Sequence, residues 1–241
     1  MKINYQAISL NKKDIAETDR LYTFYTKEIG LLHVPAKGIR KSQAKLVSQV
    51  EIFTFANISV AKNRGRGTLA GAVAENTFDN LKNNYEVLKE VYRARDIFLR
   101  IIYGSEPDEN IFNLFLEYLN LTNEIAKFKN VEQKIIWLTN SFLFKLYRLQ
   151  GYIFSFSRCR ECGKKISEQE LNFFSTHVSG VVCQNCGRKV KFKNLIDINT
   201  IKAFRLIIEN DFKNLTKVSV DNKVNNQMSI IIKDILEWVL R

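Results

Sequence analysis

Histidine, proline and cysteine are scarce in this chain of 241 residues, which contains two, two and four of them. Two isolated histidines, His33 and His177, leave little material for acid–base or triad chemistry. The sequence also lacks the phosphate-loop, dinucleotide-binding, nucleophile-elbow and zinc-protease motifs. No stretch approaches the roughly 18 consecutive apolar residues that a membrane-spanning helix needs. These absences argue against the common enzyme classes and against a membrane protein.

Residues 1–10 alternate polar and apolar side chains, whereas a secretory signal has a basic start followed by an apolar run. Apolar residues make up 46% of the chain, and 17 phenylalanines and nine tyrosines supply material for a core. This composition excludes a disordered or collagen-like chain. We therefore expect a folded, cytoplasmic protein of one or two domains.

Positive charge exceeds negative charge, with 37 Lys or Arg against 25 Asp or Glu and a formal net charge of +12. Residues 1–75 hold 12 basic and six acidic side chains, residues 76–150 hold ten of each, and residues 151–241 hold 15 and nine. A basic folded protein attracts polyanions such as nucleic acids. A coding bias towards Lys, Asn and Ile would also raise the charge, so the total alone leaves nucleic-acid binding open.

The first 75 residues have the patterns of five short β-strands, rich in β-branched and aromatic residues and separated by turn residues. These strands are expected around residues 3–7, at 21–26, from 31 to Pro35, at 51–61 and at 68–75. No helical pattern of convincing length interrupts them. The patterns predict a small β-barrel or sandwich over residues 1–76.

From Phe78 onwards apolar residues recur every three or four positions, which is the period of a helix. Helical stripes are expected over 78–102, 111–119, 131–149, 201–208 and 228–239. Asp108 and Asn199 are the expected N-caps of the second and fourth helices. The stripes predict the core of a helical domain formed by residues 77–156 and 193–241. Together with the strands they indicate an α+β multidomain fold.

All four cysteines fall in one segment of 28 residues and form two C-x2-C pairs separated by 20 residues. This spacing is typical of a zinc site, because two residues between ligands let one tight turn aim both thiolates at a single ion. With four protein ligands such a site is structural, since no position remains for a catalytic water. We expect one Zn2+ in a module over 157–192, and its predicted ligands are Cys159, Cys162, Cys183 and Cys186.

Glycines follow both cysteine pairs, and basic residues surround them. Gly163 and Gly187 are expected to relieve the backbone of the two tight turns. The basic neighbours would favour thiolates over thiols and could also contact phosphate. They are Arg158, Arg160, Lys164, Lys165, Arg188 and Lys189.

Three other interpretations of the cysteines compete with zinc. Disulfides would require an oxidising compartment, a redox dithiol needs only one pair, and metal-free cysteines would rarely keep both pairs at this spacing. His177 lies between the pairs and is treated as a surface or packing residue, with a role near the metal left open.

At the strand-rich end, strand aromatics lie beside a loop that carries several lysines and arginines, a combination that suits single-stranded nucleic acid. Cations there would follow the phosphates, and the candidates are Lys27, Lys37, Arg40, Lys41, Lys45, Arg64 and Arg66. Tyr22, Phe24 and Tyr25 are candidates for stacking on bases. The competing interpretation is that these rings fill the barrel core, because alternation turns about half of a strand's side chains inwards.

Four short patterns, taken in order along the chain, resemble the bacterial RecO family of recombination mediators. They are Thr26-Lys27-Glu28-x-Gly30, the 36–45 loop with its Lys37-Gly38-x-Arg40-Lys41, Leu149-x-Gly151-Tyr152, and Phe174-Ser175. The chain departs from the family pattern in having Ser179-Gly180 in place of a Gly-Gly pair and no proline after Tyr152. The departures concern local turns and leave the ordered set intact.

The resemblance implies an N-terminal OB fold, a helical domain and an inserted four-cysteine zinc module. It also implies a protein without enzymatic activity that works at the nucleoid and binds single- and double-stranded DNA. Such a protein would anneal complementary strands, bind the acidic C-terminal tail of single-strand-binding protein, and work with RecR to load the RecA recombinase. A zinc-ribbon transcription regulator is the alternative, and a carboxylate-metal nuclease is a third reading.

Overall fold

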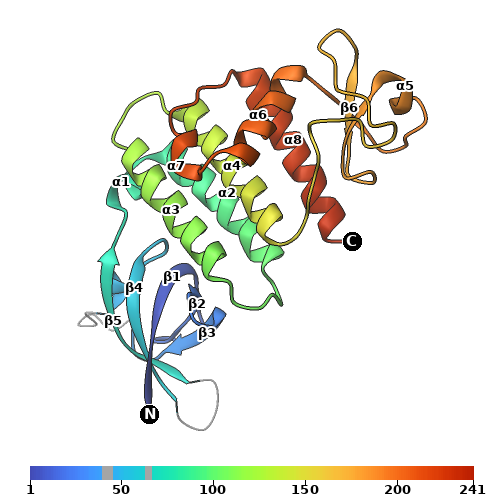
Figure 1. Ribbon diagram of the computed structural model, residues 1–241. Coiled ribbons are helices and arrows are strands. Elements are labelled where there is room, and N and C mark those ends of the chain that lie inside the picture. Colours follow the sequence, from blue (N-terminus) through green and yellow to red (C-terminus); the bar gives the residue numbers. More distant parts are fainter. Residues whose placement is uncertain (40–45, 63–66) are drawn as a thin grey trace. The chain divides into compact units, whose positions relative to one another are not determined.

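The structure, a computed structural model, describes residues 1–39, 46–62 and 67–241 (Figure 1). These residues form two compact units. The first contains residues 1–83 and 102–124, and the second contains residues 84–101 and 125–241. Residues 102–124 therefore group with the strands, and not with the other helices as the periodicity suggests. The division into domains over 1–76, 77–156 with 193–241, and 157–192 stays a prediction.

A five-stranded antiparallel sheet dominates the first unit, with the strand order β3-β2-β1-β4-β5. Its edge strands β3 and β5 approach one another, so the sheet curls into a barrel with the connectivity of an OB fold. A single 3-10 turn, η1 (Val47–Gln49), precedes β4. The strands are β1 (Lys2–Asp14), β2 (Arg20–Thr26), β3 (Gly30–Ala36), β4 (Phe55–Ala61) and β5 (Thr68–Asn76). The predicted strands and the OB-like class are confirmed.

Two layers of apolar side chains are buried around strand β2, because both of its faces are covered. Tyr22 and Phe24 point into the barrel, where their rings stack with centroids 5.7 Å apart. Tyr25 points to the opposite face and packs on Phe112 of helix α3 (Glu109–Ile125), with ring centroids 6.3 Å apart. Burial raises the pKa of the Tyr25 hydroxyl to about 12. Helix α3 is therefore part of the core of this unit.

The prediction of one continuous helix over 78–102 is wrong, because the helix is interrupted at Asn84. Helix α1 (Asp79–Asn83) ends there and α2 (Tyr85–Ile101) begins. The Asn84 side chain accepts a hydrogen bond from the Val87 amide at 3.3 Å and donates one to the Ala126 carbonyl at 3.2 Å. A side-chain cap of this kind favours the start of a new helix over continuation of the previous one, because it satisfies a free amide in the first turn of the new helix.

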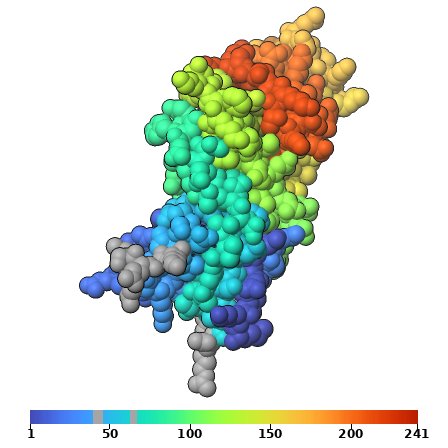
Figure 2. Space-filling model, turned by 90° about the vertical axis from the view of Figure 1, so that its left-hand side faces the viewer, coloured from blue at the N-terminus to red at the C-terminus, as the bar shows by residue number. Residues whose placement is uncertain are grey.

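Helices α2, α4 (Glu132–Leu149), α6 (Ile198–Glu209), α7 (Phe212–Leu215) and α8 (Asn222–Val239) build the bundle of the second unit. Helix α4 contacts the other four and is buried along most of its length. The yellow-green and orange-red parts of this unit accordingly lie side by side in the space-filling view (Figure 2). Within the described ranges, no helix is long and apolar enough to cross a bilayer.

The helix N-caps are only partly as predicted. Asp108 accepts a hydrogen bond from the Asn110 amide at 2.7 Å and caps α3, which confirms the prediction. For α6 the cap is Asp197, whose carboxylate accepts from the Asn199 amide at 2.9 Å, so the prediction of Asn199 is wrong. Asp221 caps α8, which begins six residues before the first residue of the predicted stripe, Met228.

A small sheet lies beside helix α8 of the second unit (Figure 1). It contains β6 (Asn172–Ser175), β7 (Gly180–Cys183) and β8 (Asn194–Ile196) in the order β7-β6-β8, with the short helix α5 (Gln184–Gly187) after β7. The periodicity analysis did not resolve these elements, because each spans only three or four residues. The sheet carries the second cysteine pair.

Candidate functional site

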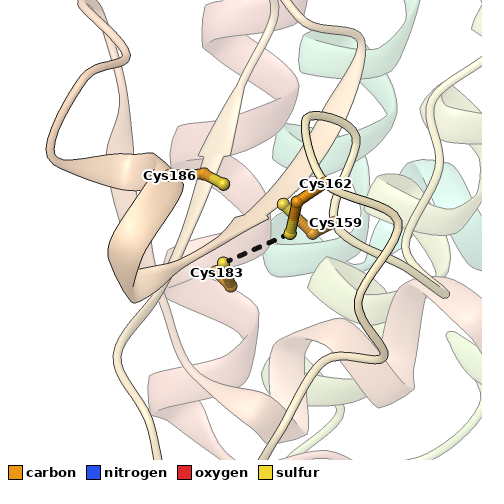
Figure 3. A group of neighbouring side chains, drawn as sticks. All are labelled: Cys159, Cys162, Cys183 and Cys186. Carbon is orange, nitrogen blue, oxygen red and sulfur yellow. Dashed lines mark hydrogen bonds between the residues drawn. The ribbon is translucent and has the colours of Figure 1, made fainter.

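The four cysteines come together as one cluster (Figure 3). Cys159 and Cys162 lie on the turn before the small sheet, whereas Cys183 ends β7 and Cys186 lies in α5. Their four Sγ atoms lie within 4.8 Å of one another, and the Sγ atoms of Cys162 and Cys183 are 3.8 Å apart. The cluster could therefore hold a metal ion.

The separations between the sulfur atoms distinguish a metal site from a disulfide. A disulfide requires about 2.05 Å between its sulfurs. A tetrahedral zinc site with Zn–S bonds of about 2.3 Å places its sulfurs about 3.8 Å apart. The distance of 3.8 Å between Cys162 and Cys183 fits the second geometry. The four cysteine thiolates are thus consistent with a site for a tetrahedral metal ion such as Zn2+.

Glycine permits the first cysteine turn, as predicted. Gly163 has a φ of +72°, a left-handed conformation that costs glycine little. Its amide donates to the Cys159 carbonyl at 2.9 Å, and the Cys159 amide donates to the Lys164 carbonyl at 2.8 Å. These two bonds close the turn and hold Cys159 and Cys162 towards the same point.

The second glycine serves a different purpose from the predicted one. Gly187 has no left-handed φ, but a Cβ at this position would lie 2.4 Å from the Phe173 ring. Gly180 is also required, since a Cβ there would lie 2.3 Å from the Ser155 carbonyl oxygen. The close approach matters because Ser155 and Gly180 form a backbone bridge between the two cysteine-bearing segments.

The thiols of the cluster affect one another's ionisation. Burial raises the pKa of Cys159, but hydrogen bonds from the amides of Cys183, Cys162 and Glu161 outweigh it and lower the pKa to about 6. The hydrogen bond with Cys162, together with the other nearby sulfurs, raises the pKa of Cys186 to about 12. Four thiolates at this spacing repel one another, so full ionisation requires a bound cation.

The basic residues near the cluster mainly hold its loops in place. Arg158 donates to the Gly163 carbonyl at 3.3 Å, and Arg160 donates to the Val178 carbonyl at 3.3 Å. Lys164 forms an ion pair with Glu170 at 2.8 Å. His177 is not part of the cluster, since its ring stacks on Phe192 with centroids 5.2 Å apart.

The predicted DNA-binding cations fall into two groups. Lys37, directly after β3, is exposed, whereas Lys27 in the β2–β3 turn forms an ion pair with Glu109 at 2.8 Å. The others lie outside the described residues, and they are Arg40, Lys41, Lys45, Arg64 and Arg66. The DNA-binding assignment stays a prediction for all seven.

The predicted stacking role of Tyr22, Phe24 and Tyr25 is contradicted by their burial. Their exposed fractions are 0%, 1% and 2%, so no base can reach the ring faces. The competing interpretation from alternation is correct for Tyr22 and Phe24. Tyr25 is buried for a reason that the sequence did not reveal, because α3 covers the outer face of β2.

The sequence analysis overlooked three exposed lysines of the barrel, Lys2, Lys13 and Lys62. Lys62 follows β4 and begins the connection to β5, and the β4–β5 loop is one of the two that bind oligonucleotides in OB folds. The stretch 62–67 could have indicated Lys62 as a DNA-binding residue, because it also contains two arginines and two glycines.

These features define an α+β protein with an OB-like barrel, a helical bundle and a four-cysteine cluster that could hold a metal ion. Two family models match the chain, "Recombination protein O N terminal" over residues 1–78 and "Recombination protein O C terminal" over residues 96–241. The chain belongs to the RecO family.

Several curated relatives are similar over nearly the whole chain. A DNA repair protein RecO from Dehalococcoides mccartyi strain CBDB1 is 26% identical over 235 residues, which cover 98% of this chain and 89% of the relative. One from Caldanaerobacter subterraneus subsp. tengcongensis is 23% identical, covering 95% and 89%. One from Clostridium novyi is 23% identical, covering 92% and 83%.

We expect the purified chain to hold about one equivalent of zinc, and Cys162→Ser to lose it on dialysis against a chelator. Cys162 is exposed, so the substitution removes a ligand without opening a core. Structural zinc contributes on the order of 10 kcal/mol of binding free energy to local folding. Metal analysis and a melting curve measure both effects, with Lys165→Ser in the same turn as the control. Stoichiometric zinc and an unchanged melting curve in Cys162→Ser would exclude the four-ligand site.

Proposed function

We propose that this chain is a DNA-binding recombination mediator and does not catalyse bond making or breaking. Membership of the RecO family supports a role in DNA repair and recombination. The observation that carries the proposal is the match of both family models, which together cover the barrel and most of the rest of the chain. The finer steps proposed below follow from the placement of charge and from the family.

The barrel is the proposed site for DNA strands. OB folds bind oligonucleotides along their strands and in the loops after β1 and β4. Lys37 and Lys62 are exposed on this unit, and the segments 40–45 and 63–66 add five further cations in the sequence. With the barrel aromatics buried, phosphate contacts are the main source of affinity. Binding should then depend on salt and vary little with sequence.

Positive charge at both ends of the chain supports strand annealing. Residues 1–75 and 151–241 each carry six more basic than acidic side chains, and the middle is neutral. Two approaching phosphate backbones repel each other, and a protein that neutralises both lowers that barrier. We propose that the chain binds single- and double-stranded DNA, anneals complementary strands, and works with RecR to load RecA.

The metal is proposed to be Zn2+ with a structural role. Cys159 and Cys162 would hold it from one turn, and Cys183 and Cys186 from the other. Its charge would balance the thiolates and fix the two segments against each other. All four ligand positions come from the protein, so the ion is given no part in chemistry on a substrate.

A groove between α2, α4 and α8 is proposed to receive the acidic, hydrophobic tail of single-strand-binding protein. Its volume is about 370 Å³, and its apolar wall is formed by Ile97, Ile136, Ile232 and Leu236. Lys233 stands at the rim with three quarters of its side chain exposed. An apolar groove with a cationic rim complements a peptide that is both apolar and acidic.

We expect Lys37→Glu combined with Arg40→Glu to weaken single-strand binding in a gel-shift titration. Each lost phosphate contact makes the slope of log affinity against log salt concentration less steep by about 0.7. For two contacts at 0.1 M salt, the affinity should fall roughly 25-fold. The control is Lys89→Glu with Lys129→Glu, which changes the net charge equally in the neutral middle, where both side chains are exposed.

If the variant with Lys37→Glu and Arg40→Glu keeps the affinity and the salt dependence of the unmodified chain, these two residues do not bind DNA. A large preference of the unmodified chain for one duplex sequence would favour the zinc-ribbon regulator, and Mg2+-dependent cleavage would favour the nuclease.

For the groove, we expect Lys233→Glu to weaken binding of a peptide from the tail of single-strand-binding protein by roughly five- to tenfold. The substitution replaces attraction by repulsion at an exposed position, where one pair contributes up to about 1 kcal/mol. Fluorescence anisotropy measures the affinity, and Lys213→Glu on α7, also exposed, is the matched control. Equal affinities for both variants would show that the tail does not occupy this groove.

A further inference from the structure

A second pocket lies in the same unit, between the small sheet and α8. It has a volume of about 240 Å³, and residues from β6, the segment before β8, and α8 line it. This volume is below the range of about 300–1,000 Å³ that is usual for drug-sized ligands. The pocket therefore suits a small group, and its lining decides which kind.

Aromatic rings form two sides of this pocket. Phe192 is 74% exposed, its backbone has a left-handed φ of +52°, and its ring stacks on His177 at an interplanar angle of 28°. Trp238 lines the pocket from α8, and its ring contacts Tyr152 and Phe154 edge to face at 6.0 Å each. A bulky residue in this backbone region is uncommon, and burial does not explain it. The exposed ring is available to stack on a flat partner.

Polar groups line the rest of the pocket. Ser175 is 1% exposed, and its hydroxyl has no hydrogen-bond partner among the described residues. The Asp234 carboxylate accepts a hydrogen bond from the Asn194 amide, and burial, followed by the nearby Glu237, raises the pKa of Asp234. A buried polar group without a partner is costly unless a ligand or water supplies one. The Ser175 hydroxyl has almost no accessible surface, so the Asp234 carboxylate is the group on this side of the pocket that favours a ligand with hydrogen-bond donors.

The charge around the pocket distinguishes a nucleic acid from a cationic peptide. Lys193 and Arg241 balance Asp234 and Glu237 within the lining itself. Outside it, exposed cations precede Phe192 in the chain, and they are Arg188, Lys189 and Lys191. Positive charge in the segment that leads to Phe192 repels a cationic side chain and attracts a phosphate backbone. The favoured ligand is thus planar, polar at its edge and attached to a polyanion.

We propose that this pocket takes one unpaired nucleobase of a DNA strand, stacked on Phe192 and hydrogen-bonded at its edge to Asp234. The inference rests on the proposed DNA-binding function and adds a second contact at the zinc-module end. A carboxylate accepts hydrogen bonds from the amino group of cytosine, which thymine lacks. Cytosine should therefore bind more tightly than thymine.

The intrinsic fluorescence of the full chain tests the proposal. Trp137 is fully buried in the bundle, so a ligand in the pocket should affect the emission of Trp238 alone. We expect an oligo(dC) pentamer to quench the emission, an oligo(dT) pentamer to bind several-fold more weakly, and Trp238→Phe to abolish the change. Phe192→Ala should weaken oligo(dC) binding roughly fivefold or more, because stacking on a base contributes about 1–3 kcal/mol.

Phe128→Ala provides the matched control, since Phe128 is 68% exposed in the same unit and lies outside the pocket. If long single strands bind but neither pentamer affects Trp238, the pocket proposal fails while the proposed function stands. If an arginine-rich peptide quenches Trp238 and oligo(dC) does not, the ligand is a protein and the proposal is overturned. Equal binding of both pentamers contradicts the contact with Asp234. Absence of any DNA binding overturns the proposed function itself.

Discussion

Helix α4 is buried on nearly every side, and its polar groups must therefore find partners inside the protein. The Trp137 indole donates to the Leu215 carbonyl at 2.9 Å, and the Tyr147 hydroxyl donates to the Ile232 carbonyl at 3.0 Å. Asn140 bonds to α2 through Arg93 and to α8 through its side-chain amide. These contacts fix α7, α8 and α2 around α4. The position of α8, which lines both the proposed groove and the proposed base pocket, therefore depends on them.

The same helix supports the cysteine-bearing segment. Phe144 on α4 packs on Phe156 and Phe204 with ring centroids 5.7 Å and 4.8 Å apart. Arg205 donates to the Phe156 carbonyl at 2.8 Å, three residues before Cys159. The aromatic contacts therefore position the start of the module, while a metal would close its two turns. Aromatic packing would thus fix the start of the segment, and a metal would fix its two cysteine turns. This arrangement suits a structural metal better than a catalytic one.

The sequence predicts the features that depend on local spacing. It does not predict those that depend on contacts between segments far apart in the chain. The two cysteine pairs predict their own cluster, because short turns set the geometry. Strand alternation predicts the barrel, yet it cannot reveal that α3 covers Tyr25 from outside. The sequence predicts Asn199 as a cap, but Asp197 has this role, because both residue types suit the position and helix boundaries are uncertain by one or two residues. The pocket beside Phe192 has no sequence signal, because the residues that line it lie far apart in the chain.

We propose that a basic barrel and a zinc-stabilised helical unit together bind DNA strands during recombination. The most direct measurement is the annealing rate of complementary single strands coated with single-strand-binding protein, with and without the zinc-loaded full chain. The account predicts faster annealing that declines as salt rises, because phosphate contacts supply the binding free energy. An unchanged annealing rate at low salt, from a chain that holds its zinc and is folded, would contradict the account.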